Sequence, residues 1–203
     1  ISINAGQTQS SALTNYMNGV LSPISFKDVN KENQSKDVVT FDSVTADVST
    51  RPVISGASYQ NEALLNAKLN ETYTLNFKGN NTITNAGYQG SITSPDDGNA
   101  VEAGYINFLN GKTTINMTQT GDSSHNYGGN AVRAVQNGTS INIENGANVT
   151  ITGGKNVRGV YAGADKLTGA LDGLVKVDGN LTENLGAGHS TAINAGNLTV
   201  GST

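Results

Sequence analysis

Cysteine and tryptophan are absent from this 203-residue chain, proline occurs 3 times, and charged residues make up 14% of the sequence. The missing cysteine is compatible with the cytosol and with bacterial surface proteins that cross the periplasm. A formal net charge of -4 excludes the strongly basic surface that binds nucleic acid or anionic lipid. No apolar run reaches the roughly 18 residues of a membrane-spanning helix, so no membrane contact is predicted.

Small neutral residues supply the polarity instead, with 25 glycines, 27 asparagines and 22 threonines. These residues satisfy turns and exposed strand faces without charge. Together with the missing cysteine, this bias favours a secreted or surface-exposed protein.

Three kinds of short strand recur in a fixed order, and each kind has one apolar residue that marks its repeat. The first kind is marked by Val101, Val132, Val157 and Ile193. The second kind is marked by Leu75, Ile106, Ile141 and Val175. The third kind is marked by Ile83, Ile115, Val149 and Leu181. Apolar and polar residues alternate around each marker, which is typical of strands with one face inward and one outward.

A coiled arrangement explains this order, because each strand can then pair in parallel with its counterpart one repeat later, about 4.8 Å away. Helical repeats would need apolar residues three and four apart, and these are missing. The sequence therefore predicts an all-β fold, a right-handed three-stranded parallel β-helix with extended corner loops. Outward asparagines are expected to hydrogen-bond along the stack.

Two regions are expected along the chain. Residues 1–60 are less regular and are interpreted as an N-terminal coil or cap region, with a short helical insert or an irregular loop over residues 10–21. Residues 61–203 form the predicted β-helix. A cap would cover strand edges that otherwise template aggregation.

No catalytic, cofactor-binding or metal site is predicted. The acidic turn at residues 96–99 lacks the spacing of a calcium loop, and neither histidine has a second ligand at metal-binding spacing. Repeat alignment sets Glu102 opposite Arg133 and Arg158, which predicts mixed charges on a solvated face. A glycosidase would need paired carboxylates, so the chain is not expected to be an enzyme.

Two corner loops, residues 91–98 and 121–129, are expected to emerge from the same edge of the solenoid, where such folds often carry binding determinants. The candidate partner contacts in or beside them are Tyr88, Asp96, Asp97, His125 and Tyr127.

Residues 61–203 resemble the passenger domains of autotransporter adhesins from Gram-negative (diderm) bacteria. The resemblance rests on the phrase Gly-Asn-Ala-Val-x-Ala starting at Gly98 and again at Gly129, on Ile-Asn-Ile-x-Asn-Gly from Ile141, and on Asn-Val-Thr-Ile-x-Gly from Asn148. It implies type V secretion, in which a signal peptide and a C-terminal outer-membrane barrel accompany the passenger. This chain would then be a passenger segment. The serine-protease members carry a Gly-Asp-Ser-Gly motif, whereas Gly121 here begins Gly-Asp-Ser-Ser.

The resemblance implies an adhesion module, displayed at the cell surface or secreted after export across the outer membrane. Its expected partners are a host or bacterial surface protein or glycan, or a second copy of itself, in cell attachment, self-association or biofilm formation. The alternatives are a polysaccharide-degrading β-helix enzyme and a purely structural rod.

Overall fold

The protein is all-β in the parts of the chain that the structure describes. The computed structural model describes residues 2–4, 24–25, 38–47, 63–66, 74–85, 99–118, 129–134, 139–163, 172–188 and 190–201. Within these ranges the chain forms 18 strands and no helix. The all-β prediction is confirmed, whereas the expected insert at residues 10–21 and the loops at 91–98 and 121–128 lie outside the described residues.

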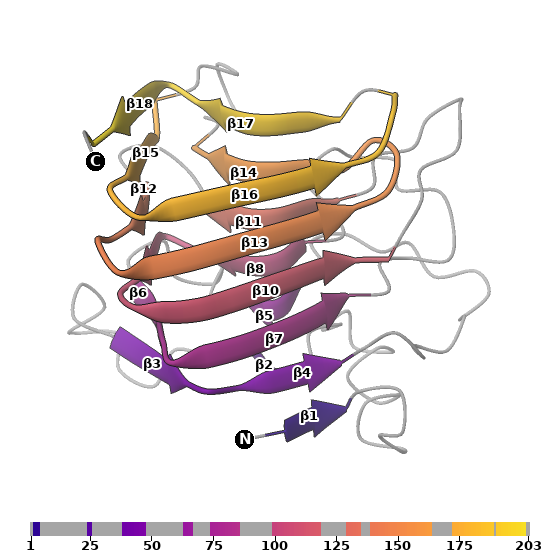
Figure 1. Ribbon diagram of the computed structural model, residues 1–203, viewed down its shortest axis with the longest axis vertical. Helices are drawn as coiled ribbons and strands as arrows, with labels where there is room; N and C mark the ends of the chain where they lie inside the picture. Colours follow the sequence, from indigo (N-terminus) through magenta and orange to yellow (C-terminus); the bar gives the residue numbers. More distant parts are fainter. Residues whose placement is uncertain are drawn as a thin grey trace.

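The strands form three sheets of six strands each, here called sheets A, B and C (Figure 1). Sheet A contains β1 (Ser2–Asn4), β4 (Thr45–Asp47), β7 (Asn80–Asn85), β10 (Gly111–Met117), β13 (Ala147–Gly153) and β16 (Asn180–Leu185). Sheet B contains β2 (Ile24–Ser25), β5 (Ala63–Asn66), β8 (Asn99–Ala103), β11 (Asn130–Ala134), β14 (Arg158–Ala162) and β17 (Thr191–Ala195). Sheet C contains β3 (Val38–Asp42), β6 (Thr74–Lys78), β9 (Tyr105–Phe108), β12 (Ser140–Ile143), β15 (Leu174–Val177) and β18 (Asn197–Val200).

Successive strands visit sheets A, B and C in turn, and each strand pairs in parallel with the strand three places later. This order is that of a three-stranded parallel β-helix, as predicted. Strands β1 to β4, which precede residue 60, belong to the same three sheets as the later strands. The described strands of residues 1–60, predicted as a coil or cap region, therefore belong to the same coil as the later strands.

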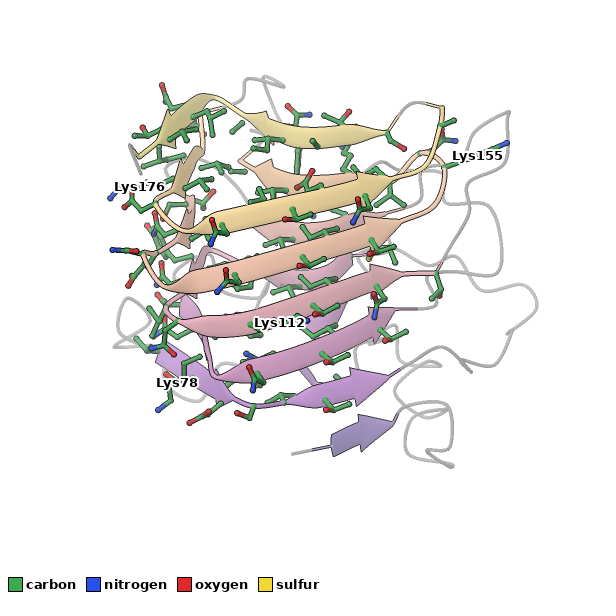
Figure 2. The ribbon with its side chains drawn as sticks, in the orientation of Figure 1. Lys78, Lys112, Lys155 and Lys176 are labelled. Atoms are coloured by element: carbon green, nitrogen blue, oxygen red, sulfur yellow. The ribbon has the colours of Figure 1, made fainter. Side chains whose placement is uncertain are left out.

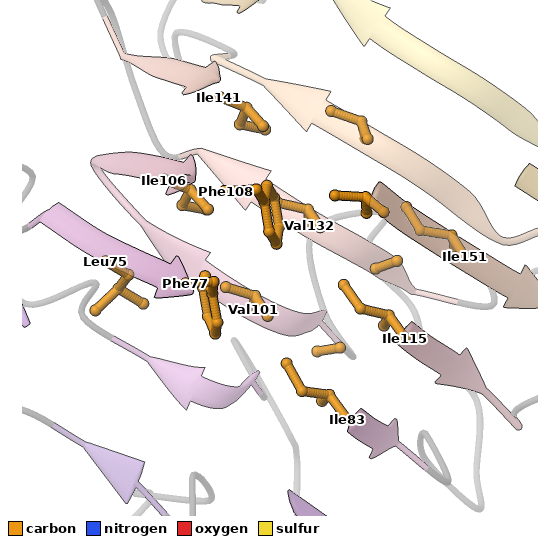
Figure 3. Close-up of a cluster of buried hydrophobic side chains, with 14 of the residues drawn as sticks. Leu75, Phe77, Ile83, Val101, Ile106, Phe108, Ile115, Val132, Ile141 and Ile151 are labelled. Carbon is orange, nitrogen blue, oxygen red and sulfur yellow. The ribbon is translucent and has the colours of Figure 1, made fainter. Parts of the chain in front are cut away.

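The core lies between the sheets and consists of columns of apolar side chains that run along the stack (Figure 3). One column on sheet C has the predicted members Leu75, Ile106, Ile141 and Val175, all fully buried. Two residues further along each strand, the rings of Phe41, Phe77 and Phe108 stack with centroids 5.3 and 5.2 Å apart. Each ring pair adds about 0.5–1.5 kcal/mol to the free energy of burial.

Two of the three predicted columns need correction. On sheet B, Val132 pairs with Val160 and not with Val157, which is buried just before β14. On sheet A, Ile115 pairs with Ile151, so the predicted members Val149 and Leu181, which pair with each other, belong to the neighbouring column. A shift of two residues keeps apolar side chains on the same face of a strand, so alternation alone could not detect the second error.

The corner between sheets C and A is built on backbone conformations with positive φ. Gly79, Gly111 and Gly146 have φ angles of 71°, 77° and 90°. A Cβ atom on Gly111 would collide with the backbone of Gly79 one coil below. Glycine is therefore required here for the close approach of successive coils as well as for the turn.

Asparagine ladders connect neighbouring coils on the outside, as predicted. On sheet C the Asn107 side chain donates to Asn76 Oδ1 at 2.9 Å, and Asn142 donates to Asn107 Oδ1 at 2.8 Å. Asn180 donates to Asn148 Oδ1 at 2.8 Å on sheet A. Successive side-chain amides are separated by the distance between stacked strands. Each amide can therefore donate a hydrogen bond to the coil below and accept one from the coil above.

Candidate functional site

The outer face of sheet A carries a column of threonines. The ladder register aligns them one above another, and the side chains are exposed or half-buried. The column consists of Thr45, Thr82, Thr114, Thr150 and Thr182. Parallel pairing sets neighbouring hydroxyls about 4.8 Å apart along the stack.

Two further polar columns flank the threonines. On one side are Asn80, Lys112, Asn148 and Asn180, and on the other are Thr84, Asn116, Thr152 and Asn184. Lys112 is the single charged residue among these eight (Figure 2). Together with the threonine column they form what we call the Thr/Asn face, which repeats the same hydroxyl and amide groups from β7 to β16.

The long strands of sheet A keep this face regular. Seven consecutive residues of β10 pair with seven of β13, and six of β13 pair with β16. Figure 1 shows β7, β10, β13 and β16 lying side by side across the front of the molecule. Hydroxyl and amide groups both donate and accept hydrogen bonds, so the chemistry of the Thr/Asn face suits hydrogen-bonded recognition.

Sheet B contains a second polar group, and this one is buried. Arg133 Nη1 lies 3.4 Å from Glu102 Oε1, and the two side chains are 2% and 0% exposed. Asn99 donates a hydrogen bond to Glu102, and Asn130 donates one to Asn99. The pairing of Glu102 with Arg133 was predicted, but the expected solvated face is wrong because both side chains are removed from water.

An aromatic ring completes the buried polar group. Tyr161 follows Arg133 in the same column, where the sequence alignment had placed Arg158. The guanidinium carbons of Arg133 and Arg158 lie 5.9 and 5.1 Å from the ring centroid. Tyr161 was missed because its column was misaligned by three residues. A period measured from Val132 to Val160 would have found it.

This buried group holds one carboxylate, Glu102, which pairs with Arg133, while Arg158 lies over the Tyr161 ring. Hydrolysis of a glycosidic bond ordinarily uses a pair of carboxyl groups. Removal of one partner of such a buried ion pair leaves the other charge buried and uncompensated, which is strongly destabilising. Among the described residues, no cluster of three or more histidine or acidic side chains could hold a metal ion.

The five predicted contact residues, Tyr88, Asp96, Asp97, His125 and Tyr127, lie outside the described residues and stay predictions. The Thr/Asn face was missed as a unit because the sequence analysis placed the binding determinants in the corner loops. The signal that could have found it is the recurrence of Thr-x-Thr or Thr-x-Asn on every sheet A strand from β7 to β16.

No helix in the described part of the chain is long and apolar enough to cross a membrane. Comparisons of the chain with protein families, with curated proteins and with solved structures found no match.

Proposed function

We propose that this chain is an adhesion module that is displayed on a cell surface or secreted and attaches through the Thr/Asn face of sheet A. The observation that supports this most directly is the in-register threonine column from β4 to β16. Its partner would be a protein or glycan of a host or bacterial surface, or a second copy of the chain. Export across the outer membrane is part of the same proposal.

The energetics of the face favour attachment by many weak contacts. A single hydrogen bond contributes about 0.5–1.5 kcal/mol net, because each group exchanges water for a partner. A rigid array makes such contacts simultaneously, and linked contacts raise the overall affinity far above that of any one. A face with Lys112 as its single charge also avoids the desolvation penalty of buried ions.

The test compares two double variants with identical chemistry. T82K/T182K adds two lysines at exposed positions of the Thr/Asn face, and T40K/T199K adds two at exposed positions of sheet C. Attachment of particles coated with each protein is measured on host cells, on a glycan array and on particles bearing the parent chain. We expect at least a tenfold loss for T82K/T182K and less than a twofold change for the control.

Equal losses in the two variants would show that added charge acts non-specifically, and full attachment by T82K/T182K would exclude the Thr/Asn face. The same surfaces can be assayed for released reducing sugars. Release of sugars by the parent chain would favour the polysaccharide-degrading enzyme over the adhesion module.

A further inference from the structure

An acidic residue occupies a core position in the last strand of sheet A. The register aligns Ile83, Ile115, Ile151 and Glu183 in one column. The three isoleucines are completely buried and face the interior of the coil. Glu183 therefore takes the place of a fourth core isoleucine on β16.

The carboxylate has no partner where it lies. Both of its oxygens are shielded from solvent and form no hydrogen bond with the described residues, although the side chain as a whole is half-buried. A Cβ atom on Gly159 of β14 would collide with the carboxyl group. The corresponding residue one coil earlier, next to Val132, is the buried Ala131. Glycine at position 159 thus leaves the space into which Glu183 extends.

No opposite charge shares this space among the described residues. Strands β13 and β17, which flank Glu183, contain no titratable side chain. On β14 the Arg158 guanidinium lies over the Tyr161 ring, and on β15 Lys176 pairs with Asp178. Because burial alone acts on the carboxyl group, the pKa of Glu183 is raised from 4.5 to about 7.

The coil that contains Glu183 includes exposed apolar side chains. Leu198 and Val200 of β18 continue buried columns of sheet C, yet they are 52% and 66% exposed. Strands β16, β17 and β18 each have a neighbour on one side only in their sheets. Within this chain, local opening of the coil breaks the pairing of these strands with β13, β14 and β15.

We propose that Glu183 is a protonation switch that keeps the coil β16–β18 closed when its carboxyl group is neutral and loosens the coil when the group ionises. The neutral acid packs against Ile151 at modest penalty, whereas an unpaired buried carboxylate is strongly unfavourable. The folded-state pKa lies above the unfolded one, so closure is strongest below about pH 4.5 and weakens as the pH rises to about 7.

The experiment combines two measurements on the whole chain. Carboxyl-carbon NMR follows the titration of Glu183, which is assigned by its disappearance in E183Q. Hydrogen exchange, corrected for the intrinsic pH dependence, follows the amides of β16–β18 and of β10–β13 from pH 4.5 to 8. We expect a titration near neutral pH and a loss of protection in β16–β18 of about one to two orders of magnitude, with no change in β10–β13.

Matched variants separate the switch from general effects. E183Q and E183I should both remove the pH dependence of protection in β16–β18, and E183I should also raise protection at pH 8. E144Q removes an exposed carboxylate and should leave the profile unchanged. H125N/H189N removes both histidines of the chain, the other side chains that ordinarily titrate near neutral pH, and should retain the loss of protection.

An ordinary carboxylate titration of Glu183 would overturn the proposal. So would a shifted titration with constant protection in β16–β18, or a pH profile that persists in E183I. If E183Q failed to fold, E183I would still decide between these outcomes, because isoleucine restores the side chain found at the three preceding positions.

Discussion

The middle coils and the C-terminal coil treat buried polar groups differently. On β7, Asn81 occupies an inward position, and its amide accepts from Val44 N at 3.0 Å and donates to Lys78 O and Thr113 Oγ1. On β16, Glu183 also occupies an inward position, but its oxygens have no hydrogen-bond partner among the described residues. The same sheet thus contains one polar core residue that is satisfied and one that is not.

The number of neighbouring coils accounts for this difference in hydrogen bonding. The coil of Asn81 has a neighbour on each side, so strand edges and side chains above and below supply its hydrogen bonds. The coil of Glu183 has one neighbour, and its inward residues are partly open to solvent. Asn81 thus has hydrogen-bond partners in both neighbouring coils, whereas Glu183 has a paired strand on one side only.

The largest expected effect comes from breaking the buried ion pair of the middle coils. R133M leaves Glu102 charged and buried, which should lower the free energy of unfolding by about 3–5 kcal/mol in urea denaturation. The double variant E102Q/R133M removes the stranded charge and should recover part of the loss. K112M on the exposed face is the control and should change stability by less than about 0.5 kcal/mol. A small loss in R133M would mean that the pair is not desolvated.

The next largest effect is expected from truncating one apolar column of sheet C at a buried position and at an exposed position. I106A creates a cavity at a fully buried site and should destabilise the chain by about 2–5 kcal/mol. L198A truncates the same column where the side chain is 52% exposed and should lower stability by less than about 1 kcal/mol. Equal losses in thermal or urea unfolding would contradict the exposed position of Leu198.

A smaller loss of stability is expected when Asn81, the hydrogen-bonded polar residue of β7, is replaced. N81A removes the acceptor of Val44 N and the donor to Thr113, so stability should fall by about 1–3 kcal/mol. N80A, at the adjacent exposed position, should change it by less than about 0.5 kcal/mol. If N81A and N80A had the same stability, an inward, hydrogen-bonded Asn81 would not be supported.

The smallest effect on stability is expected from T182V, next to Glu183 on β16. Thr182 points outward and is exposed, and valine suits a strand equally well, so unfolding should shift by less than about 0.5 kcal/mol. Attachment should nevertheless weaken, because one hydroxyl of the threonine column is lost. A T182V chain that attaches as the parent does would argue that the last row of the Thr/Asn face makes no contact.

Much of the fold was predictable because the repeat is strong. Alternation at Leu75, Ile106 and Ile141 gave the sheet C column correctly, and the outward asparagine ladder followed from residue type. Register on sheet A was not predictable from alternation, since Val149 and Ile151 are both apolar and both inward. That ambiguity hid the inward position of Glu183, which pairs with Ile151.

The sequence by itself determined the class of fold, its three strands per coil and its neutral, asparagine- and threonine-rich surface, because period-2 alternation and turn residues are local signals. Only the tertiary structure decided which polar residues are buried. The burial of Glu102 and Arg133 and the half-burial of Glu183 depend on what packs above and around each strand, and pairings between residues about 30 positions apart set that environment. A local pattern does not specify such contacts.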